Sequence, residues 1–457
     1  MYCSWKLPWY LGDQLIKSAR ARRIRRLLWI YFWLLIFEGA LRKWIFPSFS
    51  DPLLLARDPI ALLTLFAGWP LLLHKRWLSF LLPLLFIGIL AFFLSMSFGH
   101  GDLPTALFGT RVLILHVPLI FIFASVFDRS DVLRFAWSIL FLSIPMAMLI
   151  VFQSELPDTH FLNVGIGGAG TSVFDGAGGR FRPSGTFSFN TGVGSFFSLA
   201  AASLFALLYA KPLPIKQRLF CAFVCFALVI ALPFSMSRGL LAGYLQVLTA
   251  TFIALILSRS RLISLLSGVM AIILAFIIAS NLPAFNDAST AFLARWEIAG
   301  LAAGTDKKEV GHMGVASTQL QARVLGSLTG PLGNLGEVPL LGYGIGLASN
   351  FGAIRSRGTV GFFLGETPWD ASLAELGLPL GLTLIAWRVA LSTYTLFRAL
   401  RAAIRENLVP LILTGSSFVI LVGALGGGLS QPTDVGFLVL TSGLTLSSFQ
   451  CASRFSK

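Results

Sequence analysis

Apolar stretches of about 20 residues alternate with short polar segments along nearly the whole chain. A helix needs about 20 consecutive apolar residues to cross the hydrocarbon core of a bilayer. The pattern therefore predicts an all-α polytopic membrane protein with about twelve transmembrane helices. The predicted spans lie near residues 27–45, 53–73, 77–97, 104–127, 133–152, 191–210, 217–235, 239–258, 262–281, 371–396, 408–428 and 433–450.

The composition supports this class of protein. Among 457 residues, 56% are hydrophobic and only 12% are charged, about half of the roughly 25% found in soluble domains. So few charges cannot cover a water-exposed surface. The net charge of +15 would suggest nucleic acid in a soluble protein. Here the basic residues lie between the apolar stretches, so we expect membrane lipids as partners and no nucleic acid.

The distribution of basic residues predicts the topology. If the N-terminus is inside, the inner connections hold most of the Lys and Arg residues, as the positive-inside rule requires. An even number of spans then places both termini in the cytoplasm. Residues 1–26 form a basic segment that precedes the first apolar stretch, and no small-residue cleavage site follows it. We therefore expect a signal anchor instead of a cleaved signal peptide.

Two predicted outer connections are long, and long connections are usually functional or disordered. The chain accordingly divides into the basic cytoplasmic segment 1–26, spans one to nine over 27–281 with an outer loop at 153–190, a large outer loop at 282–369, and spans ten to twelve with a short cytoplasmic tail over 370–457.

Common cofactor and hydrolase motifs are absent from the sequence. The stretch Gly165–Gly170 formally matches a dinucleotide fingerprint, but it lies in an outer loop without the required strand and helix. There is no P-loop, H-E-x-x-H, G-x-S-x-G or D-x-D sequence. Cys221 and Cys225 share a helix face without acidic or histidine neighbours, which favours packing over metal binding. We expect no cofactor and no metal.

Several arginines lie on the predicted outer side, where they have no role in setting topology. They are candidate anion-binding residues, because charges at a bilayer edge are usually functional. Anchoring at the interface or in salt bridges is the alternative. The group comprises Arg180, Arg182, Arg238, Arg295 and Arg323.

Three acidic residues lie near the start of span ten. Thr367 and Asp370, with Pro368 between them, predict a capping box at the helix N-terminus, which gives Asp370 a structural explanation. Glu366 lies just outside the helix, beside a site suited to anions. Glu375 lies about one and a half turns inside, where a carboxylate needs a partner. Either a structural salt bridge or a catalytic role would explain Glu375.

Other charges fall inside the first four predicted spans. Glu38 and Arg42 are spaced i, i+4 and can pair. Arg57 and Asp58 are adjacent, so each needs a partner elsewhere. Arg111 could join the arginine group. For His116 we expect a hydrogen-bonded packing role.

An ordered set of short motifs resembles the O-antigen ligase and polymerase family of bacterial membrane glycosyltransferases. The motifs are Arg182-Pro-Ser-Gly-Thr-Phe187, Ser237-Arg238-Gly239, Arg295-Trp296, Gly342-Tyr-Gly-Ile-Gly346 and Ala374-Glu-Leu-Gly377. The resemblance covers most of residues 90–450. The segment Phe37–Trp44 lies outside the shared pattern, and the turn at Leu341–Gly346 has the glycine content of an architectural element.

The resemblance implies a helical, GT-C-like glycosyltransferase in the bacterial inner membrane. Its donor would be a glycan on undecaprenyl pyrophosphate, its acceptor a glycan or lipid-linked saccharide, and polysaccharide-assembly proteins would be possible partners. Arg238 and Arg295 fall at the positions of the pyrophosphate-binding arginines. The histidine usual in ligases is replaced by Glu366, and this departure favours a polymerase or another glycan transferase. Phe189 stands where proline is common.

The chemistry of the candidate residues fits such a transfer. Arginines make permanently charged, bidentate contacts to phosphate and could stabilise a departing pyrophosphate without a metal. A carboxylate, from Glu366, Glu375 or Asp370, could accept the proton of the acceptor hydroxyl. Two alternatives stay open, namely a transporter of lipid-linked glycans or small anions and a non-catalytic subunit of an envelope-polysaccharide complex.

Overall fold

The computed structural model describes residues 19–167, 174–175, 179–258, 262–302, 326–333, 335–356, 367–423 and 428–450. Within these residues the chain is mostly helical, as predicted. The long helices are α2 (Ala19–Ala40), α4 (Asp58–Leu72), α5 (Lys75–Ser97), α8 (Arg129–Glu155), α9 (Thr191–Ala210), α10 (Ile215–Phe234), α11 (Arg238–Leu257), α12 (Leu262–Ala279), α13 (Pro283–Ala302), α16 (Pro368–Ile404), α17 (Val409–Val422) and α18 (Pro432–Ser447). Shorter elements are α3 (Ser50–Leu53), α6 (Leu103–Arg111), α7 (Leu119–Val126), α15 (Asn350–Arg355) and the hairpin β1 (Phe174–Asp175) and β2 (Phe181–Arg182).

Eight of the described helical segments are long and apolar enough to cross a membrane. A ninth is added if α12 and α13, which are bent by 105° at their junction, count as one broken span. The fold class of an all-α polytopic membrane protein is thus supported. The predicted segments are all largely helical, but α17 has only 14 residues, and the count of twelve spans stays a prediction.

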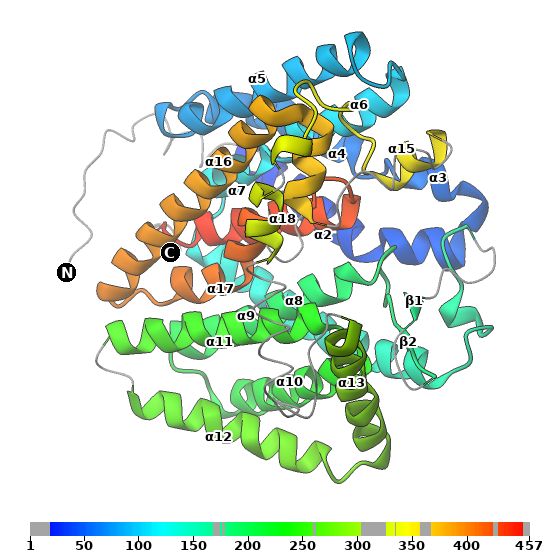
Figure 1. Cartoon of the computed structure of the whole chain (residues 1–457). Helices are drawn as coiled ribbons and strands as arrows, with labels where there is room; N and C mark the ends of the chain where they lie inside the picture. The colour runs from blue at the N-terminus through cyan, green and yellow to red at the C-terminus, as the bar shows by residue number, and fades with distance from the viewer. Residues whose placement is uncertain are drawn as a thin grey trace.

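The helix ends gather at two ends of the bundle. At one end, Thr191 at the start of α9 bonds Asp434 near the start of α18, and Trp369 on α16 bonds a carbonyl at the end of α17. At the other, Arg129 bonds the last carbonyl of α9. We call the first the loop end, because α3, α15 and the hairpin lie there (Figure 1).

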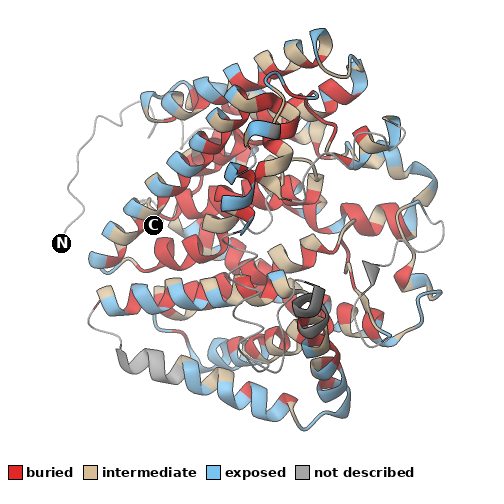
Figure 2. Ribbon diagram, in the orientation of Figure 1, coloured by how far each residue is buried: buried red, intermediate tan, exposed pale blue. Residues whose placement is uncertain are grey.

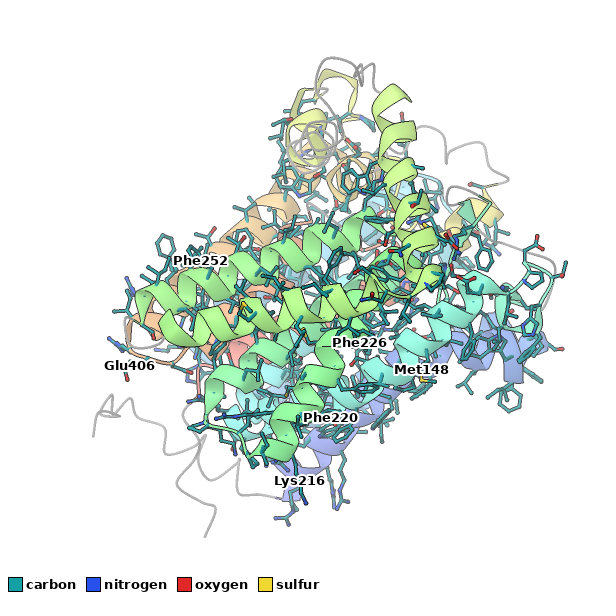
Figure 3. All side chains as sticks on the ribbon, turned by 90° about the horizontal axis from the view of Figure 1, so that it is seen from below. Met148, Lys216, Phe220, Phe226, Phe252 and Glu406 are labelled. Carbon is teal, nitrogen blue, oxygen red and sulfur yellow. The ribbon has the colours of Figure 1, made fainter. Side chains whose placement is uncertain are left out.

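Burial follows the pattern of a membrane bundle. Helices α7, α9 and α18 form the centre of the fold, and their phenylalanines, such as Phe121, Phe196 and Phe437, are completely buried (Figure 2). Outward faces are also apolar, as Phe252 on α11 and Met148 on α8 show (Figure 3). An apolar exterior of this kind suits lipid contact.

Buried ion pairs connect α2, α4 and the segment from α6 to α7. Glu38 lies 3.7 Å from Arg42 and 2.8 Å from Arg57, which confirms the predicted pairing and supplies Arg57 with a partner. Asp58 pairs instead with Arg111 and with His116. The expectation that Arg111 joins the arginine group is therefore wrong, because the neighbouring helix supplies a carboxylate that neutralises it inside the bundle.

Two further expectations concern packing residues. Cys221 and Cys225 are buried free thiols in α10, as predicted. His116 is a hydrogen-bonded core residue, since its ring nitrogens contact the Tyr31 hydroxyl at 3.1 Å and Asp58 at 3.0 Å. The side chains of Tyr31, His116, Asp58 and Arg111 thus form one connected chain of polar contacts through the N-terminal helices.

Candidate functional site

The turn between α10 and α11 presents Arg238 at the loop end. Arg238 is the first residue of α11, and the Ser237 hydroxyl caps the helix by accepting the N–H of Leu240 at 3.2 Å. Met236 has a φ of 48° although it is not glycine, and its side chain is completely buried. A left-handed conformation of this kind costs about 1–2 kcal/mol. Surrounding packing therefore holds this turn in one strained shape, as is common at functional sites.

Helix α13 folds back over the same turn. The bend between α12 and α13 brings Arg295 to the turn, where its guanidinium donates a hydrogen bond to the carbonyl of Met236. Its neighbour Trp296 is buried, and the Arg238 guanidinium lies 5.8 Å from the centre of the Trp296 ring. Two of the predicted anion-binding arginines thus meet at one turn.

Arg180 approaches the turn from the hairpin. Its guanidinium bonds Glu155 at 2.5 Å and the Ser154 hydroxyl at 3.2 Å. It also lies 5.8 Å from the ring of Phe234, the last residue of α10. Arg182 follows two residues later in β2. Arg180 is therefore partly neutralised by the Glu155 carboxylate.

A π-helical turn that follows α2, Leu41–Ile45, supports the segment after Arg182. The Lys43 ammonium donates hydrogen bonds to the Ser184 hydroxyl at 2.9 Å and to the Gly185 carbonyl at 2.6 Å. Arg42 bonds the hydroxyl of Ser188 at 3.0 Å. No local pattern connects the segment Phe37–Trp44 with the arginine motif, because the partners are separated by more than 140 residues.

Helix α16 is broken at the motif that contains Glu375. Gly377 has a φ of 78° and a ψ of 172°, which interrupts the helix. The glycine-rich loop lies against this break: a Cβ on Gly377 would stand 2.5 Å from the amide nitrogen of Gly342. Only glycine at both positions allows two backbones to approach so closely. The turn at Leu341–Gly346 is therefore architectural, as predicted, and it is joined to span ten.

Hydrogen bonds hold the loop against the broken helix. The N–H of Tyr343 donates to the Ala374 carbonyl at 2.8 Å. The Glu375 carboxylate accepts the N–H groups of Gly346 at 3.1 Å and Ala348 at 2.7 Å. No lysine or arginine pairs with Glu375 among the residues that the structure describes. A salt bridge therefore does not explain Glu375 within that part of the chain.

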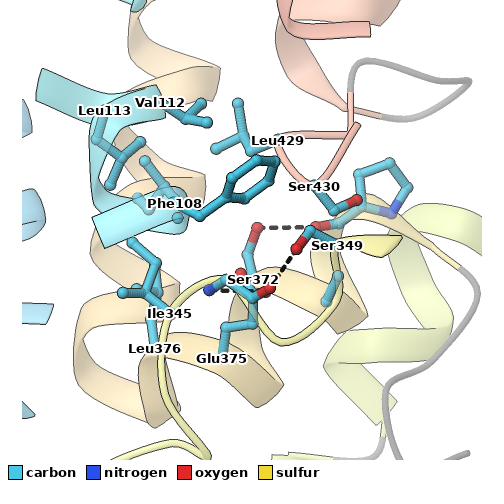
Figure 4. Close-up of a pocket in the computed structure, with 15 residues that line it drawn as sticks. Phe108, Val112, Leu113, Ile345, Ser349, Ser372, Glu375, Leu376, Leu429 and Ser430 are labelled. Atoms are coloured by element: carbon cyan, nitrogen blue, oxygen red, sulfur yellow. Dashed lines mark hydrogen bonds between the residues drawn. The ribbon is translucent and has the colours of Figure 1, made fainter. Parts of the chain in front are cut away.

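A small cavity opens beside Glu375. Figure 4 shows Glu375, Ser349, Ser372 and Ser430 around it, with Phe108 on the far wall. It has room for about 30 Å³, enough for about two water molecules and too little for a sugar ring.

The remaining acidic and basic candidates have different outcomes. Asp370 forms the predicted capping box, because its carboxylate accepts the N–H and the hydroxyl of Thr367 at 3.3 and 2.7 Å. This places Asp370 in the cap of α16. Glu366 and Arg323 lie outside the described residues.

Comparisons with known proteins assign no function to this site. No family model matches the chain, and no curated protein resembles it closely enough to count as a match. Among the described residues, no group of three or more His, Cys, Asp or Glu side chains could hold a metal ion. Support for a function therefore lies in the arginines, the acidic residues and their surroundings.

Proposed function

We propose that the chain is a metal-independent glycan polymerase or ligase of the O-antigen ligase and polymerase type. It would transfer a glycan from polyprenyl pyrophosphate to an acceptor sugar hydroxyl at the outer face of a bacterial inner membrane. The loop end would face outwards and both termini the cytoplasm. The observation that carries the proposal is the meeting of Arg238 and Arg295 at the Met236 turn.

The arginines suit the leaving group. In the transfer, the acceptor oxygen bonds the anomeric carbon while the bond from that carbon to the pyrophosphate oxygen breaks. The pyrophosphate leaves with the electron pair, so fixed positive charge must stabilise it. Arg238 and Arg295 supply such charge, and α11 begins at the same turn, so its first N–H groups would add partial positive charge there. Losing one contact made in the transition state costs roughly 2–4 kcal/mol, or about 10²–10³ in rate.

The acceptor hydroxyl must lose a proton to a base. Glu366 stands at the position of the ligase histidine and is the first candidate, which favours a polymerase. Glu375 is the second, because it lines the cavity beside the broken helix. Asp370 is the third, although its carboxylate is occupied by the cap of α16. Glutamine at the correct position should keep donor binding and abolish transfer.

The direct test uses purified full-length protein in lipid nanodiscs with a synthetic polyprenyl-pyrophosphate glycan. Arg238→Lys keeps the charge but loses the planar fork, so the transfer rate should fall about 10²-fold. Arg134→Lys is the matched control, because Arg134 is 67% exposed and pairs with Asp131 away from the loop end. Normal transfer by both Arg238→Lys and Arg295→Lys would contradict the proposed site and support a non-catalytic subunit.

Gene deletion separates the two reactions. Loss of a polymerase should leave single lipid-linked repeats in the envelope, whereas loss of a ligase should leave finished lipid-linked polymer. No change in either pool would count against both activities.

A transporter is the second candidate function, and the polar chain of Tyr31, His116, Asp58 and Arg111 favours it. Connected ionisable residues inside a membrane bundle are typical of proton relays. If this chain carries protons, Asp58→Asn should abolish proton flux into proteoliposomes, and Arg238→Lys should not. Absence of flux in the unmodified protein would remove this alternative.

A further inference from the structure

Asn190 stands at the N-cap position of α9 but does not cap the helix. An asparagine there normally accepts a hydrogen bond from a backbone N–H of the first turn. In this helix the Asn190 side chain makes no cap hydrogen bond. Backbone groups replace it, since the N–H of Gly192 bonds the Phe189 carbonyl and the N–H of Val193 bonds the Asn190 carbonyl, both at 3.2 Å. The amide group is therefore available for another purpose.

The Asn190 amide is buried without a partner. Its side chain is 4% exposed, and neither its nitrogen nor its oxygen has a hydrogen-bond partner among the described residues. Leaving such a group unpaired inside a protein is unfavourable, and buried amides are nearly always bonded. Exchanging the nitrogen and oxygen positions would not help, because both atoms are unpaired.

A second unpaired acceptor lies at the same junction. The side-chain oxygen of Gln431, just before α18, is buried and unbonded in the described part of the chain. Thr191, next to Asn190, donates a hydrogen bond to Asp434 at 2.8 Å. This bond fixes the first turn of α18 beside the first turn of α9. We call the two helix starts, with Asn190 and Gln431, the α9–α18 junction.

The junction adjoins the arginine turn. One turn into α9, a Cβ on Gly194 would lie 3.7 Å from the hydroxyl of Ser237, the residue before Arg238. A ligand whose charged part reaches Arg238 could therefore place a neutral part at the start of α9. The two sites are neighbours on adjacent helices at the loop end.

The unpaired atoms define the chemistry of the ligand. The Asn190 oxygen and the Gln431 oxygen need hydrogen-bond donors, while the Asn190 nitrogen needs an acceptor. Ionised pyrophosphate offers acceptors only, so it would leave both oxygens unpaired. Sugar hydroxyl and acetamido groups offer donors and acceptors together. We propose that the α9–α18 junction binds a sugar residue of the substrate through Asn190, with Gln431 as a second contact. The identity of the rest of the donor molecule rests on the proposed function.

The first test measures stability without ligand. Asn190→Leu replaces the unpaired amide by an apolar group with the same branching at Cγ, so the thermal midpoint should stay equal or rise. The matched control is Asn163→Leu, because the Asn163 amide is also buried but donates to the carbonyls of Gln153, Leu156 and Pro157. Asn163→Leu should lower the midpoint. An equal loss in Asn190→Leu would overturn the inference, and Asn190→Ala checks that the result is not caused by leucine.

The second test measures binding to purified full-length protein in nanodiscs. The probes are polyprenyl pyrophosphate and the same lipid carrying N-acetylglucosamine or glucose. The unmodified protein should bind a sugar-bearing probe about tenfold more tightly, as expected for two neutral hydrogen bonds. Asn190→Leu should erase this difference and keep the affinity for the sugar-free lipid. Equal affinity of the unmodified protein for all three probes, or an unchanged difference in Asn190→Leu, would overturn the inference.

Free sugars separate this inference from the proposed function. If no pyrophosphate lipid binds, the proposed function fails. Thermal shifts with free N-acetylglucosamine and glucose then test the sugar site by itself. A shift in the unmodified protein that Asn190→Leu abolishes would still support the sugar site. Absence of any sugar-induced shift in that case would overturn it.

Discussion

Replacing Gly377 by alanine tests the crossing between α16 and the glycine-rich loop. Gly377 adopts a φ of 78° and a ψ of 172°, a conformation essentially restricted to glycine, where a residue with a Cβ costs about 1–3 kcal/mol. A Cβ there would also stand 2.4 Å from the Leu340 carbonyl oxygen and 2.5 Å from the Gly342 nitrogen. Both are backbone atoms, so no side chain can turn away to make room. The loop itself would have to move.

Movement of the loop would cost hydrogen bonds as well. Two backbone bonds cross the contact, from Tyr343 to Ala374 at 2.8 Å and from Gly344 to Glu375 at 3.0 Å. Each contributes about 1 kcal/mol. Together with the backbone strain, Gly377→Ala should destabilise the protein by about 3–5 kcal/mol.

The matched control is Gly101→Ala. Gly101 has a similar φ of 66°, but a Cβ there would meet nothing within 4 Å. Only the conformational cost of about 1–2 kcal/mol should apply. Thermal unfolding of the purified variants in one detergent should therefore show a midpoint shift for Gly377→Ala that is larger by a factor of about 1.5 or more. Equal shifts in the two variants would refute the close crossing of the backbones.

Three further predictions concern metal dependence, pH and topology. Transfer of lipid-linked glycan should continue in excess EDTA, and a loss of activity that magnesium restores would contradict the arginine mechanism. The hydrogen bond from Arg355, followed by that from Thr105, lowers the pKa of Asp102. The contribution of Asp102 to stability is therefore present above the unfolded pKa of about 4 and is lost as the pH falls below it. Asp102→Asn should flatten the dependence of the unfolding midpoint on pH between about 5 and 2, and an unchanged profile would rule out this contribution. An impermeant thiol reagent should label a cysteine at Arg355 in intact cells and leave one at Lys216 unlabelled, because the two positions lie at opposite ends of the bundle, and the reverse pattern would invert the topology.

Local sequence signals predicted the helices and their ends well. Apolar stretches such as Lys75–Ser97 and Thr191–Ala210 exceed the length of a span, so they are helical in any arrangement of the bundle. The capping box at Thr367 and Asp370 also follows from neighbouring residues alone. The i, i+4 pair of Glu38 and Arg42 needs only helical geometry.

Contacts between distant segments could not be predicted in the same way. Asp58 and Arg111 are 53 residues apart in sequence, and nothing local indicates which helix faces which. The approach of Arg295 to the Met236 turn depends on the bend after α12, which the apolar pattern alone does not reveal. The unpaired amide of Asn190 is likewise invisible in the sequence, where asparagine before a helix indicates only a cap.

The buried Lys43 has a consequence for synthesis and membrane insertion. Its carbonyl partner, Gly185, is 142 residues further along the chain. At a translation rate of about 5–20 residues per second, the ribosome would reach Gly185 roughly 7–30 s after Lys43. During this interval the ammonium group cannot make its native bonds, and a charge exposed to lipid is unfavourable by about 3 kcal/mol. The segment that carries Lys43 therefore stays at the membrane interface or within the insertion machinery until the residues before α9 are made, so a ribosome that stalls before residue 184 would leave a nascent chain in which this segment has no native partners.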